Sequence, residues 1–150
     1  MFKKLLLGAC VLAIAGAAYV RMSPTDLARF AVAPIATEAG DTATSNSFKA
    51  ARQITTPATD ILQAVNAVAL KTERTQIIAG SVAEGLVTYE TRSALMGYPD
   101  YTTATVIDSE GGPLLVIRGE SRFGKSDLGV NRDRVEGWLT QLGPLVVPAS

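Results

Sequence analysis

The chain has 150 residues with 14 basic and 14 acidic side chains, which is long enough for one domain with an appendage and gives no net charge. Because Lys3, Lys4 and Arg21 flank an N-terminal apolar run and every acidic residue follows it, the remaining chain is slightly acidic, which argues against nucleic-acid binding. With no histidine and a single cysteine, Cys10, the chain offers no histidine base, thiolate metal site or disulfide, and we expect neither a metal nor another cofactor.

The apolar run over residues 5–20 reads LLLGACVLAIAGAAYV and predicts a transmembrane helix. With its basic flanks, this helix would occupy residues 1–22 as a signal anchor. The basic start favours a single-pass protein of the cytoplasmic (inner) membrane, with its C-terminal domain on the periplasmic side. Two alternatives remain open: a cleaved signal peptide, since Ala15-Gly16-Ala17 fits a cleavage site, and a lipoprotein modified at Cys10.

Residues 23–55 contain Pro24, Pro34 and the polar stretch TEAGDTATSNSF without a sustained hydrophobic period, which predicts a tether or irregular segment. A short helix or strand is expected only near residues 27–32. Thr56-Pro57 is typical of a helix start. We therefore expect the folded domain to occupy residues 56–145, followed by a tail over residues 146–150.

Within this domain, the hydrophobic period changes from that of a helix to that of strands and back again. A first helix is predicted to end at about Lys71, and a last helix that carries Trp138 to end at Gly143-Pro144. Alternating residues predict four strands between them, over 75–82, 86–95, 101–108 and 114–122. The expected fold is α+β: an N-terminal transmembrane helix, then a helix, a four-stranded antiparallel meander and a helix, with the last two helices packed on one sheet face.

Charged side chains alternate onto one face of two of these strands. Five of them are expected to project away from the helices: Glu90, Arg92, Arg118, Glu120 and Arg122. This face is either solvated, with weak cross-strand ion pairs, or a polar groove for an anionic ligand.

The segment SRFGKSDLGVNRDR, residues 121–134, joins the last strand to the last helix. Its structural motif is interpreted as a compact turn in which five residues have backbone roles: Gly124, Ser126, Asp127, Gly129 and Asn131. We expect Asp127 to accept hydrogen bonds from nearby amides and Asn131 to cap the helix. Leu128 and Val130 are expected to pack into the core.

The same segment supports an anion-binding interpretation. A helix N-terminus attracts anions, and this one is flanked by Arg122, Lys125 and Arg132. The spacing of a nucleotide-binding P-loop is missing, so the pattern does not indicate a nucleotide.

The stretch RGESRFGKSDLGVNRDRVEGWL, together with YETRSALMGYPDY upstream, resembles the bacterial and plant domain-of-unknown-function family 1499 (DUF1499). The shared pattern is Ser-Arg-x-Gly-x-Ser-Asp-Leu-Gly-x-Asn-x-x-Arg-(Ile/Val), which runs here from Ser121 to Val135. YVRMSPTDLARF, after the apolar run, is similar to membrane-anchored alphaproteobacterial members. The resemblance covers about residues 56–142 and that stretch, and it implies no activity because the family has none established. The Cys-containing segment of many members is missing here.

The favoured function is a non-enzymatic, extracytoplasmic binding module that contacts the membrane through its N-terminal helix. Its ligand would be a partner protein or an anionic or lipid molecule. The predicted contact residues are Arg92, Arg118, Arg122, Lys125 and Arg132. An accessory subunit of a membrane complex is an alternative that the sequence does not separate from this one.

A carboxylate-based enzyme acting in the periplasm is the other alternative. Glu120 or Asp127 would act as the base, with Arg122 or Tyr101 as the polarising group. Glycoside hydrolysis needs two opposed acids. Glu90 and Glu120 are the only two acids whose strand positions suit this reaction. We assign no catalytic residue.

Overall fold

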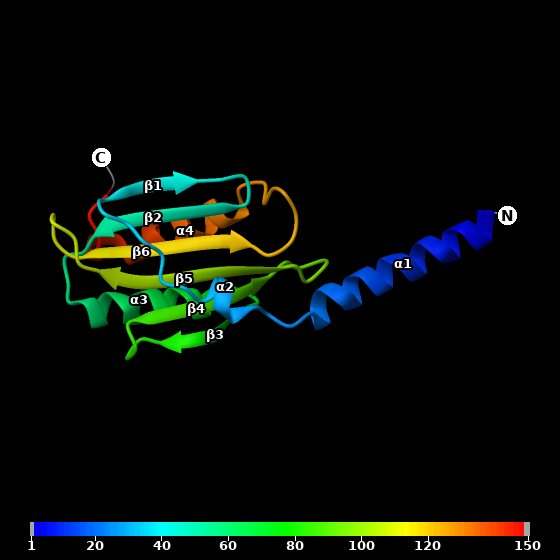
Figure 1. The fold of residues 1–150 in the computed structure, drawn as a ribbon, viewed down its shortest axis with the longest axis horizontal. Helices are drawn as coiled ribbons and strands as arrows, with labels where there is room; N and C mark the ends of the chain where they lie inside the picture. The colour runs from blue at the N-terminus through cyan, green and yellow to red at the C-terminus, as the bar shows by residue number, and fades with distance from the viewer. Residues whose placement is uncertain (1, 149–150) are drawn as a thin grey trace.

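The computed structural model describes residues 2–148. Helix α1 leaves one end of the domain and points away from it (Figure 1). The described helices are α1 (Phe2–Met22), α2 (Leu27–Phe30), α3 (Ala58–Lys71), α4 (Val130–Leu142) and the short 3-10 turn η1 (Gly143–Leu145).

An antiparallel sheet of six strands forms the centre of the domain. Its strand order is β1-β2-β6-β5-β4-β3, so β2 pairs with the last strand of the chain, β6, and β1 forms the edge beside β2 (Figure 1). The strands are β1 (Gly40–Ala43), β2 (Ser47–Gln53), β3 (Thr75–Ser81), β4 (Leu86–Arg92), β5 (Pro99–Ile107) and β6 (Leu114–Ser121).

Helices α3 and α4 cover one face of the sheet and enclose the main core, as predicted. The Trp138 indole of α4 meets the Tyr89 ring of β4 edge-on, with ring centroids 5.5 Å apart. The indole Nε1–H also donates to Thr72 Oγ1 at 2.9 Å, just beyond α3. Both aromatic side chains are buried, so this contact fixes the two helices against the sheet.

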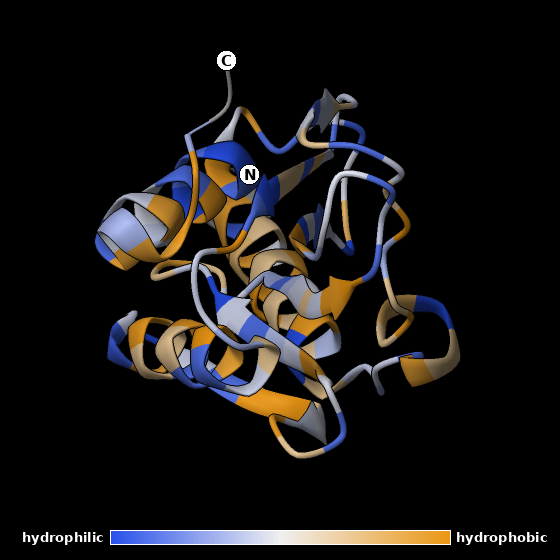
Figure 2. Cartoon of the chain, turned by 90° about the vertical axis from the view of Figure 1, so that its left-hand side faces the viewer, coloured by the Kyte–Doolittle hydropathy of each residue, from blue (hydrophilic) through white to orange (hydrophobic). Residues whose placement is uncertain are grey.

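Residues 23–39, here called the strap, cross the second face of the sheet. Phe30 packs on Tyr101 with ring centroids 4.4 Å apart, and Thr103 Oγ1 donates to the Phe30 carbonyl at 3.1 Å. Thr25 Oγ1 and the Tyr101 hydroxyl lie 2.9 Å apart. Figure 2 shows the resulting layers edge-on, with α3 and α4 on one side of the sheet and α2 on the other.

The predicted four-stranded meander is corrected to six strands. The additional strands, β1 and β2, come from the segment 23–55 that was predicted to be irregular. Strand β1 has four residues and is largely exposed, so it carries no hydrophobic pattern. In β2, Ala50 and Ala51 are both buried although they face opposite sides, because the strap covers the second face. The expected alternation is therefore absent.

The predicted transmembrane signal anchor over residues 1–22 is also wrong. Across the part of the chain that the structure describes, no helix is both long and apolar enough to cross a membrane. The apolar run over residues 5–20 is shorter than the about 20 residues that a span requires. Its last residue, Val20, is buried against the domain.

Candidate functional site

The loop between β6 and α4 is organised by the Asp127 carboxylate. Its Oδ1 accepts from the Gly129 amide at 2.9 Å, and its Oδ2 accepts from the Asn131 amide at 3.2 Å. Helix α4 begins at Val130, so Asn131 lies inside the first turn. The predicted amide contacts of Asp127 are confirmed, but the capping group is Asp127 rather than Asn131.

The apolar residues of this loop do not enter the core. Leu128 is 92% exposed and adopts a φ of 54°, and Val130 is 48% exposed. The left-handed backbone at Leu128 turns its side chain outward, because the loop must present successive amides to the Asp127 carboxylate. The prediction that Leu128 and Val130 pack into the core is wrong.

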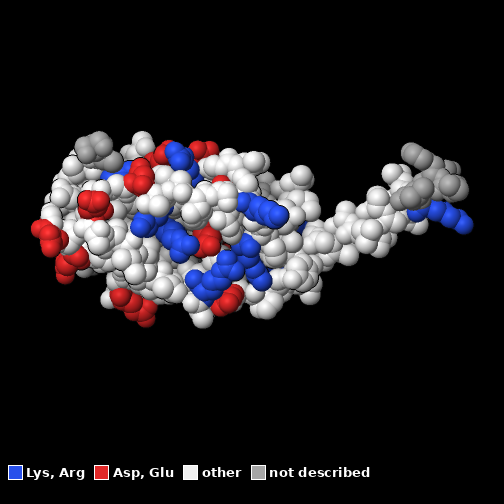
Figure 3. Space-filling model, turned by 45° about the horizontal axis from the view of Figure 1, so that its top comes forward, with Lys and Arg blue, Asp and Glu red and all other residues white. Residues whose placement is uncertain are grey.

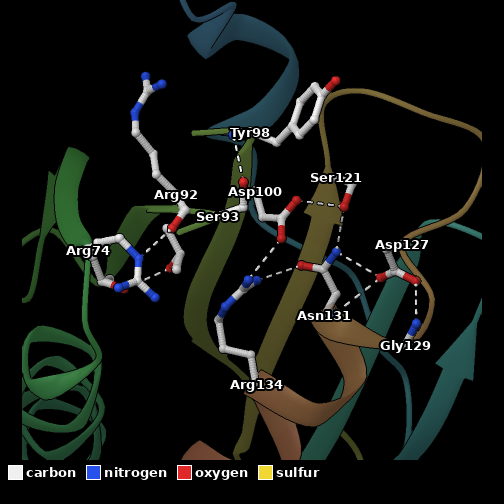
Figure 4. Close-up of polar contacts among 12 residues, drawn as sticks. Arg74, Arg92, Ser93, Tyr98, Asp100, Ser121, Asp127, Gly129, Asn131 and Arg134 are labelled. Carbon is white, nitrogen blue, oxygen red and sulfur yellow. Dashed lines mark hydrogen bonds and ion pairs between the residues drawn. The ribbon is translucent and has the colours of Figure 1, made fainter. Parts of the chain in front are cut away.

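Asn131 instead belongs to a group of polar side chains, here called the polar cluster: Asp100, Ser121, Asp127, Asn131 and Arg134 (Figure 4). Four of them close a ring of hydrogen bonds, and Asp127 joins it through Asn131. Its amide Nδ2 donates to Ser121 Oγ at 3.0 Å and to Asp127 Oδ2 at 2.8 Å. Arg134 donates to Asn131 Oδ1 and to Asp100 Oδ2, each at 2.8 Å. Ser121 closes the ring by donating to Asp100 Oδ1 at 2.6 Å. Nearly every polar group in the cluster therefore has a partner.

The cluster also depends on a glycine in the neighbouring strand. A Cβ at Gly119 of β6 would lie 2.8 Å from Asn131 Oδ1 and 3.1 Å from its Cβ. These distances are below van der Waals contact, so only glycine leaves room for the buried Asn131 side chain.

Acid is expected to weaken the fold through Asp127. Burial raises the pKa of this carboxyl, but hydrogen bonds from Gly129 and from the side chain and amide of Asn131 outweigh it and hold the pKa below its usual value. The resulting stabilisation is present above the unfolded-state pKa, about 3.9, and is lost as the pH falls through the lower folded-state value. Urea unfolding from neutral pH down to about pH 3 should therefore show the wild type and Asp127→Asn converging in acid. A constant difference between the two proteins over this range would contradict the assignment.

Two of the five predicted basic contacts lie on the second face of the sheet, in ion pairs. Arg92 donates to both carboxylate oxygens of Glu90, at 2.8 and 3.0 Å, and to the Gly97 carbonyl at 3.0 Å. Arg118 lies 2.7 Å from Glu120. The predicted projection of these four charged residues away from the helices is confirmed by the strand register.

Arg122 follows β6 and contacts the strap on the same side, donating to the Ser23 carbonyl at 3.0 Å. The other two predicted contacts lie elsewhere. Lys125 is exposed on the loop. Arg132 stacks 4.9 Å from the centre of the Phe48 ring, on the side covered by the helices. The structure does not bring the five cations into one site, and Figure 3 shows acidic side chains among the basic ones that gather on one face.

The two carboxylates of the enzyme hypothesis do not face each other across a cleft. Glu90 and Glu120 are both register partners of Tyr101, so the three side chains form one row across β4, β5 and β6. The buried Tyr101 lies between the two acids, and Phe30 of the strap packs on its ring. Arg92 and Arg118 neutralise them. This arrangement leaves no place for a sugar ring between two opposed acids.

One predicted cation, Arg92, borders a cavity of about 570 Å³ where α1, α3 and the β4–β5 turn meet. The charged residues around this basic cavity are Arg21, Lys71, Glu73, Arg74, Glu90 and Arg92. Arg74 donates to the Arg92 carbonyl at 3.0 Å and to Glu73 at 2.8 Å, and it lies beside Arg92 in Figure 4. Basic groups therefore outnumber acidic ones at this cavity.

Two of these cations converge on one glycine. Gly97 has a φ of 72°, and a Cβ there would lie 2.8 Å from Arg21 Nε. Arg92 donates to the carbonyl of the same residue. Sequence reasoning missed Arg21, Lys71 and Arg74, because no local pattern links the end of α1 to the end of α3 and the β4–β5 turn.

Comparison with known proteins supports the family and adds no activity. Curated proteins give no match. Among solved structures, the crystal structure of protein CV1439 from Chromobacterium violaceum is 18% identical, covering 67% of this chain and 94% of that chain, with a TM-score of 0.36. The family model described as "Protein of unknown function (DUF1499)" matches residues 20–142, which begin on the last turn of α1 and include the whole strap. The chain therefore belongs to the DUF1499 family.

Proposed function

We propose that this domain is a binding module for a ligand with an oxyanion group, a carboxylate or a phosphate, and that the group binds in the basic cavity. The observation that carries the proposal is the approach of Arg21 and Arg92 to the same residue, Gly97. Glu90 balances the charge of Arg92, and Arg21 brings a further positive charge to the same glycine. A bound oxyanion would balance this additional charge.

The hydrogen-bonding capacity of the cavity supports the same ligand. Arg92 uses one N–H of each of its three nitrogens on Glu90 and Gly97, so two of its five N–H donors are left. A guanidinium group pairs well with planar carboxylate or tetrahedral phosphate oxygens. Lys71 adds a further positive charge to the lining of the cavity.

Binding fits the cavity better than catalysis does. Its two carboxylates, Glu73 and Glu90, are the only acidic groups of the described lining and both accept hydrogen bonds from arginine. A general base must be able to take a proton from its substrate, and these pairs disfavour that role.

Arg21→Gln tests the site. Titration of the full chain with inorganic phosphate, followed by NMR, is expected to give a dissociation constant about tenfold higher than that of the wild type, because one charge-assisted contact is lost. Arg118→Gln is the matched control: it removes the same charge from the same domain, outside the cavity. The proposal is wrong if the wild type does not bind phosphate, or if the two variants weaken binding equally.

A further inference from the structure

A second cavity of about 650 Å³ lies beside the basic cavity, between the last turns of α1 and the loops at the end of the sheet. Its wall is mainly apolar. The apolar side chains that define this apolar cavity are Tyr19 and Val20 of α1 and Met96, Tyr98, Phe123 and Val130 of the domain.

Aromatic rings shape this cavity but do not close it. Phe123 meets Tyr19 at 6.4 Å and Tyr98 at 6.0 Å between ring centroids. Tyr19 is nevertheless 67% exposed and Tyr98 42% exposed. Apolar area that the fold leaves exposed is available to stabilise an apolar ligand.

The two cavities meet along a boundary that is one residue wide. Ser93 lines both. On α1, Val20 lines the apolar cavity and the next residue, Arg21, lines the basic one. On the β4–β5 turn, Met96 lines the apolar cavity and the next residue, Gly97, lines the basic one. A ligand with one charged end and one apolar chain can therefore occupy both.

We infer that the ligand is a single-chain amphiphile, with its oxyanion head at Arg21 and Arg92 and its alkyl chain in the apolar cavity. The position of the head rests on the proposed function. Charge sets the orientation: the polar part of the apolar cavity contains the Asp100 and Asp127 carboxylates, which repel an anionic head and direct it to the arginines.

Chain-length dependence tests the alkyl part. Inorganic phosphate, butyl phosphate and octyl phosphate are titrated into the full chain below the concentrations at which the alkyl phosphates form micelles. Each CH₂ that enters the cavity is expected to lower the dissociation constant by about two- to fourfold. The upper value corresponds to complete burial of that methylene. Octyl phosphate should therefore bind far more tightly than inorganic phosphate. Equal affinities for the three probes would overturn the inference.

Two glycines of α1 give a matched pair of variants for the position of the chain. Gly16 lines the apolar cavity and Gly8 lies outside its lining, and an added Cβ meets nothing within 4 Å at either position. Leucine at both sites improves helix propensity equally. Gly16→Leu is expected to weaken octyl phosphate binding about tenfold without changing inorganic phosphate binding, and Gly8→Leu to change neither. Equal effects of the two variants on octyl phosphate would place the chain elsewhere and overturn the inference.

The two proposals fail separately in this experiment. If inorganic phosphate binds through Arg21 and the alkyl chain adds nothing, the proposed function stands and the amphiphile is wrong; a protein segment is then the better candidate for the apolar cavity. If octyl phosphate binding responds to Gly16→Leu but not to Arg21→Gln, the head does not lie at the arginines, and both the proposed function and the amphiphile as oriented here are wrong.

Discussion

Replacing Asn131 by alanine is expected to lower the free energy of unfolding by about 3 kcal/mol. Asn131 is completely buried and holds Ser121, Asp127 and Arg134 together through its amide. Its removal leaves a cavity and deprives a nearly buried arginine of one acceptor, which costs more than the loss of an exposed hydrogen bond. Urea denaturation followed by circular dichroism measures the effect.

Gln141→Ala is the control for this experiment. Gln141 lies on the same helix and donates a hydrogen bond to Gly137 at the surface. Its replacement is expected to change the free energy of unfolding by no more than about 0.5 kcal/mol. If Asn131→Ala destabilises the domain no more than Gln141→Ala does, the polar cluster does not have the structural role assigned to it.

Gly119→Ala is expected to cost about 2 kcal/mol, because the new methyl group would overlap the Asn131 side chain. The same replacement at Gly137 of α4 meets nothing within 4 Å and should stabilise the domain by about 0.5–1 kcal/mol through helix propensity. The two glycine-to-alanine variants are therefore expected to have opposite signs in the same denaturation assay.

A double-mutant cycle identifies the atoms that cause this effect. In Asn131→Ala, the amide oxygen and carbon that clash with the Gly119 methyl group are gone. Gly119→Ala should consequently cost about 1 kcal/mol less in that background than in the wild type. Additive effects would show that the methyl group clashes with something other than the Asn131 amide group.

Much of the fold follows from local patterns. The four strands β3 to β6 each have two distinct faces, as in β4, where Val87 and Tyr89 face the helices while Thr88 and Glu90 face the strap. This two-residue period also placed the charges of β4 and β6 on the correct side. Successive side chains of a strand point to opposite faces, so one residue of known face determines the face of all the others. Strands β1 and β2 were missed: β1 is short and exposed, and β2 carries buried alanines on both faces. In the strap, the short element expected near residues 27–32 is present as α2, but its position across the sheet was not predicted.

The candidate site was less predictable, because it depends on contacts between distant segments. Arg132 lies on α4 and reaches Phe48 on the side of the sheet that the helices cover, whereas the loop sequence had grouped it with the cations of the polar face. The exposure of Leu128 follows from a left-handed residue in a loop, where apolar character is a poor guide. The approach of Arg21 and Arg92 to the same glycine, Gly97, depends on the path of the chain after α1.

The pairing of β2 with β6 also constrains how the domain folds. Ser47 pairs with Glu120 and Gln53 with Leu114, so the β1–β2 hairpin leaves the ribosome long before its partner strand exists. During that interval the inner edge of β2 has unsatisfied backbone groups that can pair with another chain. The meander β3 to β6 contains only pairings between successive strands and can form by itself. We therefore expect the hairpin and the strap to be added last, on a sheet whose other strands are already in place.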